Sequence, residues 1–303
     1  MKLNYKKLTL IAGAITLSSW SALAQTTDGT VSPVQSPADP YGLTLAGPVM
    51  AAGSDAASKN FDQNVLPSLT SFIQSALPEG VNNTKSTAFQ IDPNKLILAT
   101  KSAVSVTFVS EGAAFHNAVG VNTTTAGNDP SSWWNEVTSP STSLVFPDAS
   151  STEGGFASGA YGTRTASEPL LPGDFVNLGT QAAGTKLDFF LMANGANQAW
   201  APIYSANESI NNDGFNQHVA AFTPTIFAVP QLNSPYIFLS FEDQWGGGDH
   251  DINDTIIAVN IGAANVKALL ATPEPAMWLT LGSFLGLAIW AKRRTDRTSE
   301  SLV

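Results

Sequence analysis

The sequence predicts an all-β protein: a jelly-roll-like β-sandwich with one short N-terminal amphipathic helix and a C-terminal transmembrane sorting helix. The chain has 24 Gly and 18 Pro among 303 residues, and only 13% of it is charged, a composition that suits an extracellular β protein. Short runs of β-branched and aromatic residues are separated by Gly, Pro and Asn turns. Neither alternating helices nor a repeat of 20–50 residues is visible, which favours a sandwich.

The N-terminus has the pattern of a secretory signal peptide. Three lysines within the first seven residues precede an apolar run at 8–17, which is too short to span a membrane. Small residues follow at positions 22 and 24. We therefore expect signal peptidase to remove residues 1–24 by cleaving between Ala24 and Gln25. Residues 25–58, rich in Ser, Pro, Ala and Gly, are expected to be a flexible linker.

A helical N-terminal extension is predicted at residues 59–94. Apolar side chains recur at helical spacing over 61–77. Pro67 is tolerated only in a first turn, so the helix is expected to begin near Asn64. No Lys or Arg lies on its polar face, and packing on the β domain is therefore favoured over binding to a membrane surface or a partner.

The predicted β-sandwich domain covers residues 95–264. We expect strands at 95–100, 103–109, 144–146, 175–178, 187–192, 219–222, 225–229, 236–241 and 255–259. Between them, residues 122–169 are typical of a polar loop that contains Trp133 and Trp134. Neighbouring tryptophans could stack on sugar rings, but the favoured interpretation is one buried ring and one ring that covers the edge of the core.

The last two predicted strands enclose an acidic, glycine-rich loop. Its oxygen-bearing side chains are those of Glu242, Asp243, Asp249, Asp251, Asn253 and Asp254. No Lys or Arg occurs between Lys186 and Lys267. Two carboxylates about 4 Å apart repel by roughly 4 kcal/mol at an effective dielectric near 20. Unless a cation lies among them, crowded carboxylates separate or raise one another's pKa. Oxygen ligands without clustered His or Cys favour a hard cation, and Ca²⁺ is the prediction.

The spacing of this loop is only partly that of an EF-hand. Asp249, Asp251 and Asn253 alternate as in the first half of an EF-hand loop. Asp254 stands where that loop requires Gly, and a strand follows in place of a helix. We therefore predict a calcium loop in a β-hairpin, with residues 246–248 supplying glycines that accept positive φ. A solvated acidic turn is the alternative.

Other chemistry has less support in the sequence. Glu111 is a candidate ligand from a distant strand, and Trp245 inside the loop is a candidate glycan contact. His116 could approach the loop, whereas His250 is expected to point away from the ion. The chain has no Cys and no ordered catalytic motif, P-loop or dinucleotide glycine pattern, so we do not expect an enzyme.

The acidic loop also carries a resemblance. Residues 242–254, Glu-Asp-Gln-Trp-Gly-Gly-Gly-Asp-His-Asp-Ile-Asn-Asp, resemble the E-D-x-x-G-G-x-D-x-D-x-N-D signature of an exported bacterial family, the domain-of-unknown-function 4114 family. Residues 104–120 and 172–196 are similar to its opening and middle strands. The resemblance covers about half of the chain and implies one β-rich domain without an established activity.

The C-terminal segment, residues 265–303, contains a second recognisable pattern. An apolar run of about 16 residues at 276–291 would form a helix about 24 Å long, slightly short of a ~30 Å hydrocarbon core. Tryptophans lie near its ends and a basic tail follows, which places the C-terminus in the cytoplasm. Pro273, Glu274 and Pro275 precede the run. Triplet, span and tail resemble a PEP-CTERM sorting signal.

The PEP-CTERM resemblance implies an exopolysaccharide-producing Gram-negative bacterium and an exosortase-type protease that cleaves near the triplet. A plain membrane anchor is the alternative. The protein would cross the inner membrane, be held transiently by the C-terminal helix, and then reach the cell surface or extracellular matrix. Without the charges of the two end segments, 7 of 14 basic and 22 of 24 acidic residues remain, a net charge of about −15. Such a body repels nucleic acid and anionic lipid.

Three functions are compatible with these observations. We expect an exported, calcium-stabilised structural or adhesive protein of the cell envelope or exopolysaccharide matrix. The first alternative is a calcium-dependent carbohydrate-binding module, for which exopolysaccharide would be the partner. A glycan-active hydrolase is the third, since carboxylates are abundant, but the sequence gives no separation for an acid–base pair.

Overall fold

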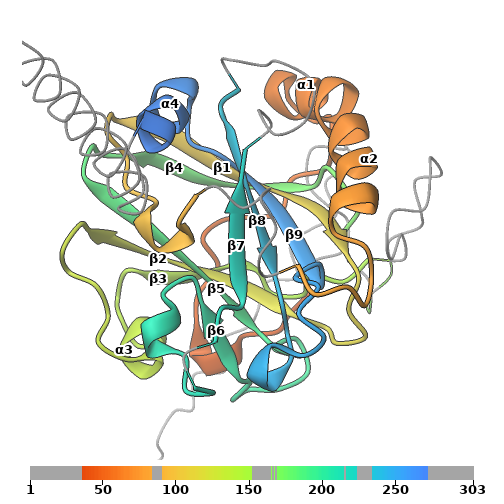
Figure 1. The fold of residues 1–303 in the computed structure, drawn as a ribbon. Helices are drawn as coiled ribbons and strands as arrows, with labels where there is room; N and C mark the ends of the chain where they lie inside the picture. The colour runs from red at the N-terminus through yellow and green to blue at the C-terminus, as the bar shows by residue number, and fades with distance from the viewer. Residues whose placement is uncertain are drawn as a thin grey trace, which may run out of the picture.

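The computed structural model describes residues 36–83, 91–151, 165, 167, 169–214, 216–223 and 234–271. These residues form a five-stranded sheet in the order β4-β1-β9-β8-β7 and a four-stranded sheet in the order β3-β2-β5-β6, with antiparallel pairing between neighbouring strands (Figure 1). The strands are β1 (Ser102–Glu111), β2 (Ala118–Thr125), β3 (Thr142–Phe146), β4 (Phe175–Gln181), β5 (Thr185–Met192), β6 (Ile203–Ser205), β7 (Val219–Phe222), β8 (Tyr236–Phe241) and β9 (Thr255–Asn260). The α-helices are α1 (Ala56–Asn64), α2 (Leu66–Ala76), α3 (Trp133–Val137) and α4 (Ala263–Ala271).

The predicted β-sandwich is confirmed, but the strand order differs from that of a jelly roll. Strands β7, β8 and β9 follow one another as a meander within one sheet, whereas a jelly roll winds two Greek keys across both sheets. The strand expected at 95–100 is replaced by a short 3₁₀ turn, η2 (Pro93–Lys95), and an isolated bridge from Ile97 to Lys186. The strand expected at 225–229 lies outside the described residues.

Alternation along the strands places one row of side chains between the sheets. In β5, Leu187, Phe189 and Leu191 belong to the main core with residues of the five-stranded sheet such as Val106 and Ile257. The intervening side chains of β5 point to the opposite face, as the period of two requires. The main core is therefore the space between the sheets, and the outer face of each sheet needs its own cover.

Strand β2 was not predicted, because it contains residues that are uncommon in strands. Gly120 is one of them, and it pairs in register with Phe190 of β5. A Cβ on Gly120 would overlap the Phe190 ring. The glycine thus leaves room for an aromatic side chain that fills the outer face of the four-stranded sheet.

The helical extension covers the outer face of the five-stranded sheet (Figure 1). Phe61, Leu69 and Ile73 pack on Phe238 of β8 and its neighbours, so the expected packing on the β domain is confirmed. The extension contains two helices, not one beginning near residue 64. The first, α1, begins at Ala56 behind an Asp55 capping box, and the second, α2, carries a proline in its first turn.

Part of the expected linker at 25–58 is packed on the sandwich. Leu45 forms a parallel bridge with Leu144, and Met50 forms an antiparallel bridge with Phe175. Polar and small residues in this segment resembled a linker, but its backbone pairs with strand edges. The part before residue 36 lies outside the described residues.

No helix among the described residues is long and apolar enough to cross a membrane. The expected signal peptide at 1–24, the triplet at 273–275 and the apolar run at 276–291 all lie outside the described residues.

Candidate metal centre

The acidic loop connects β8 and β9, whose last paired residues are Phe241 and Thr255. Three consecutive glycines, residues 246–248, all have positive φ, as the sequence predicts. His250 and Ile252 also have positive φ, at 64° and 53°, a conformation that costs free energy in side-chain-bearing residues. Ile252 is fully buried, so packing holds this part of the loop in place.

The first acidic group contains Glu242, Asp243 and Asp254. Each offers one carboxylate oxygen, and these oxygens all lie within 4.8 Å of one another. Glu242 and Asp243 are 0% and 3% exposed. The backbone N–H of Asp243 donates to Asp254 Oδ2 at 2.7 Å, and the side-chain amide of Asn117 donates to Asp243 Oδ2 at 2.8 Å. The hairpin ends and a neighbouring loop therefore fix these carboxylates at close range.

The electrostatics of the first group favour a bound cation. Burial raises the pKa of Glu242 to about 7. Burial, followed by the charges of Asp243 and Glu242, raises the pKa of Asp254 to about 9. The Oε2 atom of Glu242 is buried and has no hydrogen-bond partner among the described residues. A buried oxygen without a partner costs free energy, and a hard cation coordinated by these three carboxylates would satisfy it.

The second acidic group contains Glu79, Asp249 and Asp251, whose carboxylate oxygens also lie within 4.8 Å of one another. Asp251 is 1% exposed, whereas Glu79 and Asp249 are exposed. The structure thus distributes the predicted ligands over two groups in place of one centre. Glu79 was not predicted, because its only sequence signal is one acid in a Pro-Glu-Gly turn.

Asn253 lies beside the second group. Its side-chain nitrogen donates to the Leu77 carbonyl at 3.1 Å. Its Oδ1 is buried and has no hydrogen-bond partner in the part of the chain that the structure describes. A hydrogen bond from the Asn253 side chain opposes the rise in the pKa of Glu79, so Asn253 is held next to Glu79.

Two other candidate residues belong to neither acidic group among the described residues. Glu111 pairs with Thr255 at the end of the acidic loop, but its Oε2 accepts from the Ser151 N–H at 3.2 Å. The ring of His116 faces Ser150 at 3.1 Å and Asp148 at 3.4 Å. Glu111 therefore lies next to the acidic loop without joining its acidic groups, and the His116 ring contacts other residues.

A buried histidine for which the sequence predicts no role contacts the start of the acidic loop. His218 Nε2 lies 2.6 Å from Asp213 Oδ2, and its Nδ1 lies 3.1 Å from the Glu242 carbonyl. The same Asp213 oxygen accepts from the Gly246 N–H at 2.8 Å. The ring of His218 stacks on Tyr204 with centroids 3.9 Å apart. Asp213 and His218 thus hold the backbone of Glu242 and of Gly246 in position.

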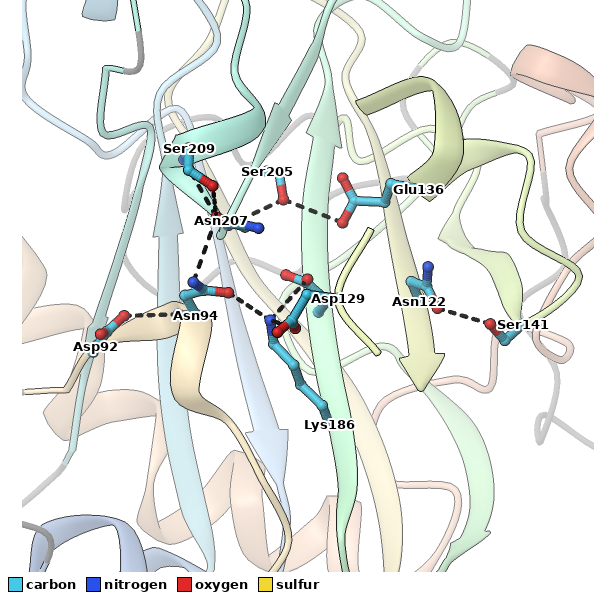
Figure 2. A network of polar contacts seen from close by, with 11 residues as sticks. Asp92, Asn94, Asn122, Asp129, Glu136, Ser141, Lys186, Ser205, Asn207 and Ser209 are labelled. Atoms are coloured by element: carbon cyan, nitrogen blue, oxygen red, sulfur yellow. Dashed lines mark hydrogen bonds and ion pairs between the residues drawn. The ribbon is translucent and has the colours of Figure 1, made fainter. Parts of the chain in front are cut away.

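A second buried polar cluster differs from the acidic loop, because it contains a lysine side chain among its acidic residues (Figure 2). Lys186 is 2% exposed and points toward Asp129 and Asn94, each at 2.5 Å, with Asp188 at 3.1 Å. Burial alone lowers the pKa of Lys186, but Asp188 and Asp129 raise it above its ordinary value. Glu136 is fully buried nearby and accepts from the Ser205 hydroxyl at 3.1 Å.

Comparison with known proteins gives one match. Residues 182–262 match a protein family described as Domain of unknown function (DUF4114). The matched stretch contains the whole acidic loop but not Glu79, and it does not extend to residues 104–120, which had suggested a wider resemblance. No curated protein and no solved structure matches the chain.

Proposed function

We propose that this is an exported, non-enzymatic structural or adhesive protein whose β-sandwich is stabilised by Ca²⁺ bound at the β8–β9 loop. One observation carries the proposal: carboxylate oxygens of Glu242, Asp243 and Asp254 lie within 4.8 Å of one another, and Glu242 Oε2 is buried without a partner within the described ranges. In the Lys186 cluster a side-chain ammonium lies 3.1 Å from the buried Asp188 carboxylate. In the hairpin loop, we propose that Ca²⁺ is the cation beside the carboxylates.

The ligand chemistry favours Ca²⁺ over other divalent ions. All three side chains of the first group offer hard carboxylate oxygens, and the chain has no Cys. Ca²⁺ accepts six to eight oxygens in irregular geometry, whereas Mg²⁺ requires a near-ideal octahedron. Extracellular calcium modules bind with Kd values of about 10⁻⁴ to 10⁻³ M. A free Ca²⁺ concentration tenfold above Kd would add about 1.4 kcal/mol of stability, which matters in a chain without disulfides.

Thermal unfolding of the purified protein tests the proposal. We expect Tm to rise with Ca²⁺ and to fall after EGTA, with a much smaller response to Mg²⁺ at the same concentration. Unfolding curves that coincide with and without Ca²⁺ would exclude a stabilising calcium site. Elemental analysis of calcium-equilibrated protein gives the stoichiometry independently.

Carbohydrate binding is the second candidate, and a surface of four aromatic rings favours it. This aromatic surface consists of Tyr41, Trp133, Trp134 and Trp200. Trp134 and Trp200 stack with centroids 6.3 Å apart and are 45% and 69% exposed. Trp133 is partly buried and packs on the core, whereas Trp134 is exposed. The expected pair of one buried ring and one ring at the core edge is therefore met only in part, and both residues lie on helix α3 and not in a loop.

The chemistry of the aromatic surface suits a neutral glycan. Exposed indole faces offer flat apolar area. Asn135 directly follows Trp134 in the sequence, Asn197 and Gln198 shortly precede Trp200, and their exposed side-chain amides can bond to hydroxyls. Trp245, 64% exposed in the acidic loop, is a separate candidate contact. Retention on the producer's exopolysaccharide, with and without EGTA, distinguishes calcium-dependent binding near Trp245 from calcium-independent binding at the aromatic surface.

Delivery to the surface is part of the proposal. Residues 1–24 would direct export, and an exosortase-type protease would cleave near Pro273, Glu274 and Pro275. Intact-mass measurement on protein recovered from the medium and from membranes tests this step. A mature form that retains residues 276–291 in both fractions would support a plain anchor.

A further inference from the structure

The turn that follows α2 is tied closely to the acidic loop. The Gly80 N–H donates to Asp251 Oδ2 at 2.9 Å. Asn83 makes two more contacts, from its backbone N–H to the His250 carbonyl at 2.8 Å and from its side chain to the Asp251 carbonyl at 2.9 Å. These bonds bring Glu79 beside carboxylates that lie about 170 residues later in the chain, as the Gly80–Asp251 separation of 171 indicates.

The carboxylates of this group repel one another. Burial, followed by the charges of Asp251 and Asp249, raises the pKa of Glu79 above its ordinary value. Burial is also the largest cause of the raised pKa of Asp251, and Asp249 adds to it. Hydrogen bonds from the Gly80 N–H and from Asn253 oppose the rise in the pKa of Asp251 without cancelling it. The backbone therefore holds three acids together although their charges favour separation.

Asn253 provides an independent indication of a ligand. Asn253 is 2% exposed, and its Oδ1 has no hydrogen-bond partner among the residues that the structure describes. A Cβ built on Gly112 would lie 3.0 Å from Asn253 Oδ1 and 3.7 Å from Glu79 Oε2. Both oxygens therefore face the same space. Gly112 does not have positive φ, so its backbone conformation does not require a glycine. A side chain at this position would instead fill the space that the two oxygens face.

We propose that Glu79, Asp249, Asp251 and Asn253 Oδ1 bind a second Ca²⁺, which fastens the helical extension to the β8–β9 loop. Three carboxylates and one amide oxygen are the mixed oxygen set that Ca²⁺ accepts, with water completing the coordination. This site is additional to that of Glu242, Asp243 and Asp254, and it does not require the first site to be filled.

The second cation would act on a defined part of the fold. Glu79 follows α2 directly, and α1 and α2 cover the outer face of β8 and β9 through Phe61, Leu69 and Ile73. The loop supplies the other ligands. Ca²⁺ at this position would therefore lower the rate at which the extension opens from the sheet, beyond what the apolar contacts achieve.

Calcium stoichiometry of the full chain tests the inference. We expect equilibrium dialysis with ⁴⁵Ca²⁺ to give two equivalents for the unmodified protein and one for Glu79→Gln. The double variant Glu242→Gln with Asp254→Asn should also keep one. Glu208→Gln, which neutralises an exposed acid outside both groups, is the matched control and should keep two.

The outcomes separate the two sites. One equivalent that is lost in the Glu242/Asp254 variant but kept in Glu79→Gln would overturn the second site and leave the first. One equivalent with the opposite pattern would overturn the first site alone, and no bound Ca²⁺ would overturn both.

Hydrogen exchange gives a second readout. Ca²⁺ should slow exchange in residues 56–83 at least about tenfold in the unmodified protein, and Glu79→Gln should remove that protection. Gly112→Ala, which adds no charge but fills the space, should also remove it. Protection by Ca²⁺ that persists in both variants would contradict the inference.

Discussion

The backbone N–H of Asp243 donates a 2.7 Å hydrogen bond to Asp254 Oδ2, across a loop that leaves β8 and returns into β9. This bond holds two acidic residues at the base of the hairpin where their charges oppose one another. The hairpin is formed by the pairing of β8 with β9, from Tyr236 with Asn260 to Phe241 with Thr255. Strand pairing therefore compensates for the electrostatic cost, and a cation would remove that cost.

Replacing Asp254 with Asn should raise stability in the absence of calcium and remove the stabilisation by calcium. In EGTA at neutral pH, Asp254→Asn should raise Tm, because folding must protonate Asp254, whose pKa rises to about 9, whereas Asn mimics the protonated form and its amide oxygen can still accept the Asp243 N–H. In excess Ca²⁺ the variant should lose the stabilisation of about 1.4 kcal/mol expected at tenfold Kd. Calorimetry in both buffers measures the two effects. A variant less stable than the unmodified protein in EGTA would mean that the ionised Asp254 is favourable without a cation.

Replacing Glu136 with Gln should stabilise the protein at neutral pH. Burial, followed by the charge of Asp188, raises the pKa of Glu136 well above its ordinary value, although Ser205 and Lys186 act in the opposite direction. The folded state therefore prefers protonated Glu136, and stability falls as pH rises from the ordinary Glu pKa toward the raised one. Glutamine mimics the protonated form at every pH.

Urea unfolding between pH 4 and pH 8 measures this difference. The free energy of unfolding of Glu136→Gln should match that of the unmodified protein near pH 4 and exceed it increasingly at higher pH. Glu208→Gln, at an exposed position, should show no such trend. A difference that stays constant with pH would indicate that Glu136 is ionised in the fold, with Lys186 as its partner.

Adding a side chain at Gly120 should destabilise the four-stranded sheet. A Cβ there would overlap the Phe190 ring, and overpacking of this kind costs about 1–3 kcal/mol. Chemical denaturation of Gly120→Ala gives the cost. Because the two residues are in direct register, Gly120→Ala combined with Phe190→Leu should lose less stability than the sum of the single changes. Strict additivity would show that the ring is not the obstacle.

Removing one exposed indole ring distinguishes the two glycan surfaces. Trp200→Ala should change the free energy of unfolding by no more than about 0.5 kcal/mol, because the residue is 69% exposed. If the aromatic surface binds glycan, retention on neutral exopolysaccharide should fall about tenfold, or about 1.4 kcal/mol, and should not depend on EGTA. Loss of retention in Trp245→Ala and in EGTA, with Trp200→Ala unaffected, would place binding at the calcium loop.

Local sequence patterns predicted many of the strands but few of the contacts between segments that lie far apart in the chain. Strands β8 and β9 were predicted because they are rich in β-branched and aromatic residues, and β5 because most of its residues from 187 to 192 are apolar. Strand β2 was not predicted, because Gly120 is disfavoured in isolated strands, and the ring of Phe190 across the sheet explains the glycine. The segment around Leu45 and Met50 was expected to be a linker because its backbone pairing depends on strand edges far along the chain.

The sequence by itself determined that a loop between two strands carries five carboxylates without a basic residue nearby along the chain, since composition and spacing are local properties. Only the tertiary structure decided how those acids divide, because the grouping depends on distances through space. Packing of α2 on the outer face of the sheet brings Glu79 to Asp249 and Asp251, and strand pairing brings Glu242 to Asp254. Coulomb energy depends on separation in three dimensions, and residues far apart in sequence acquire a separation only when the chain folds.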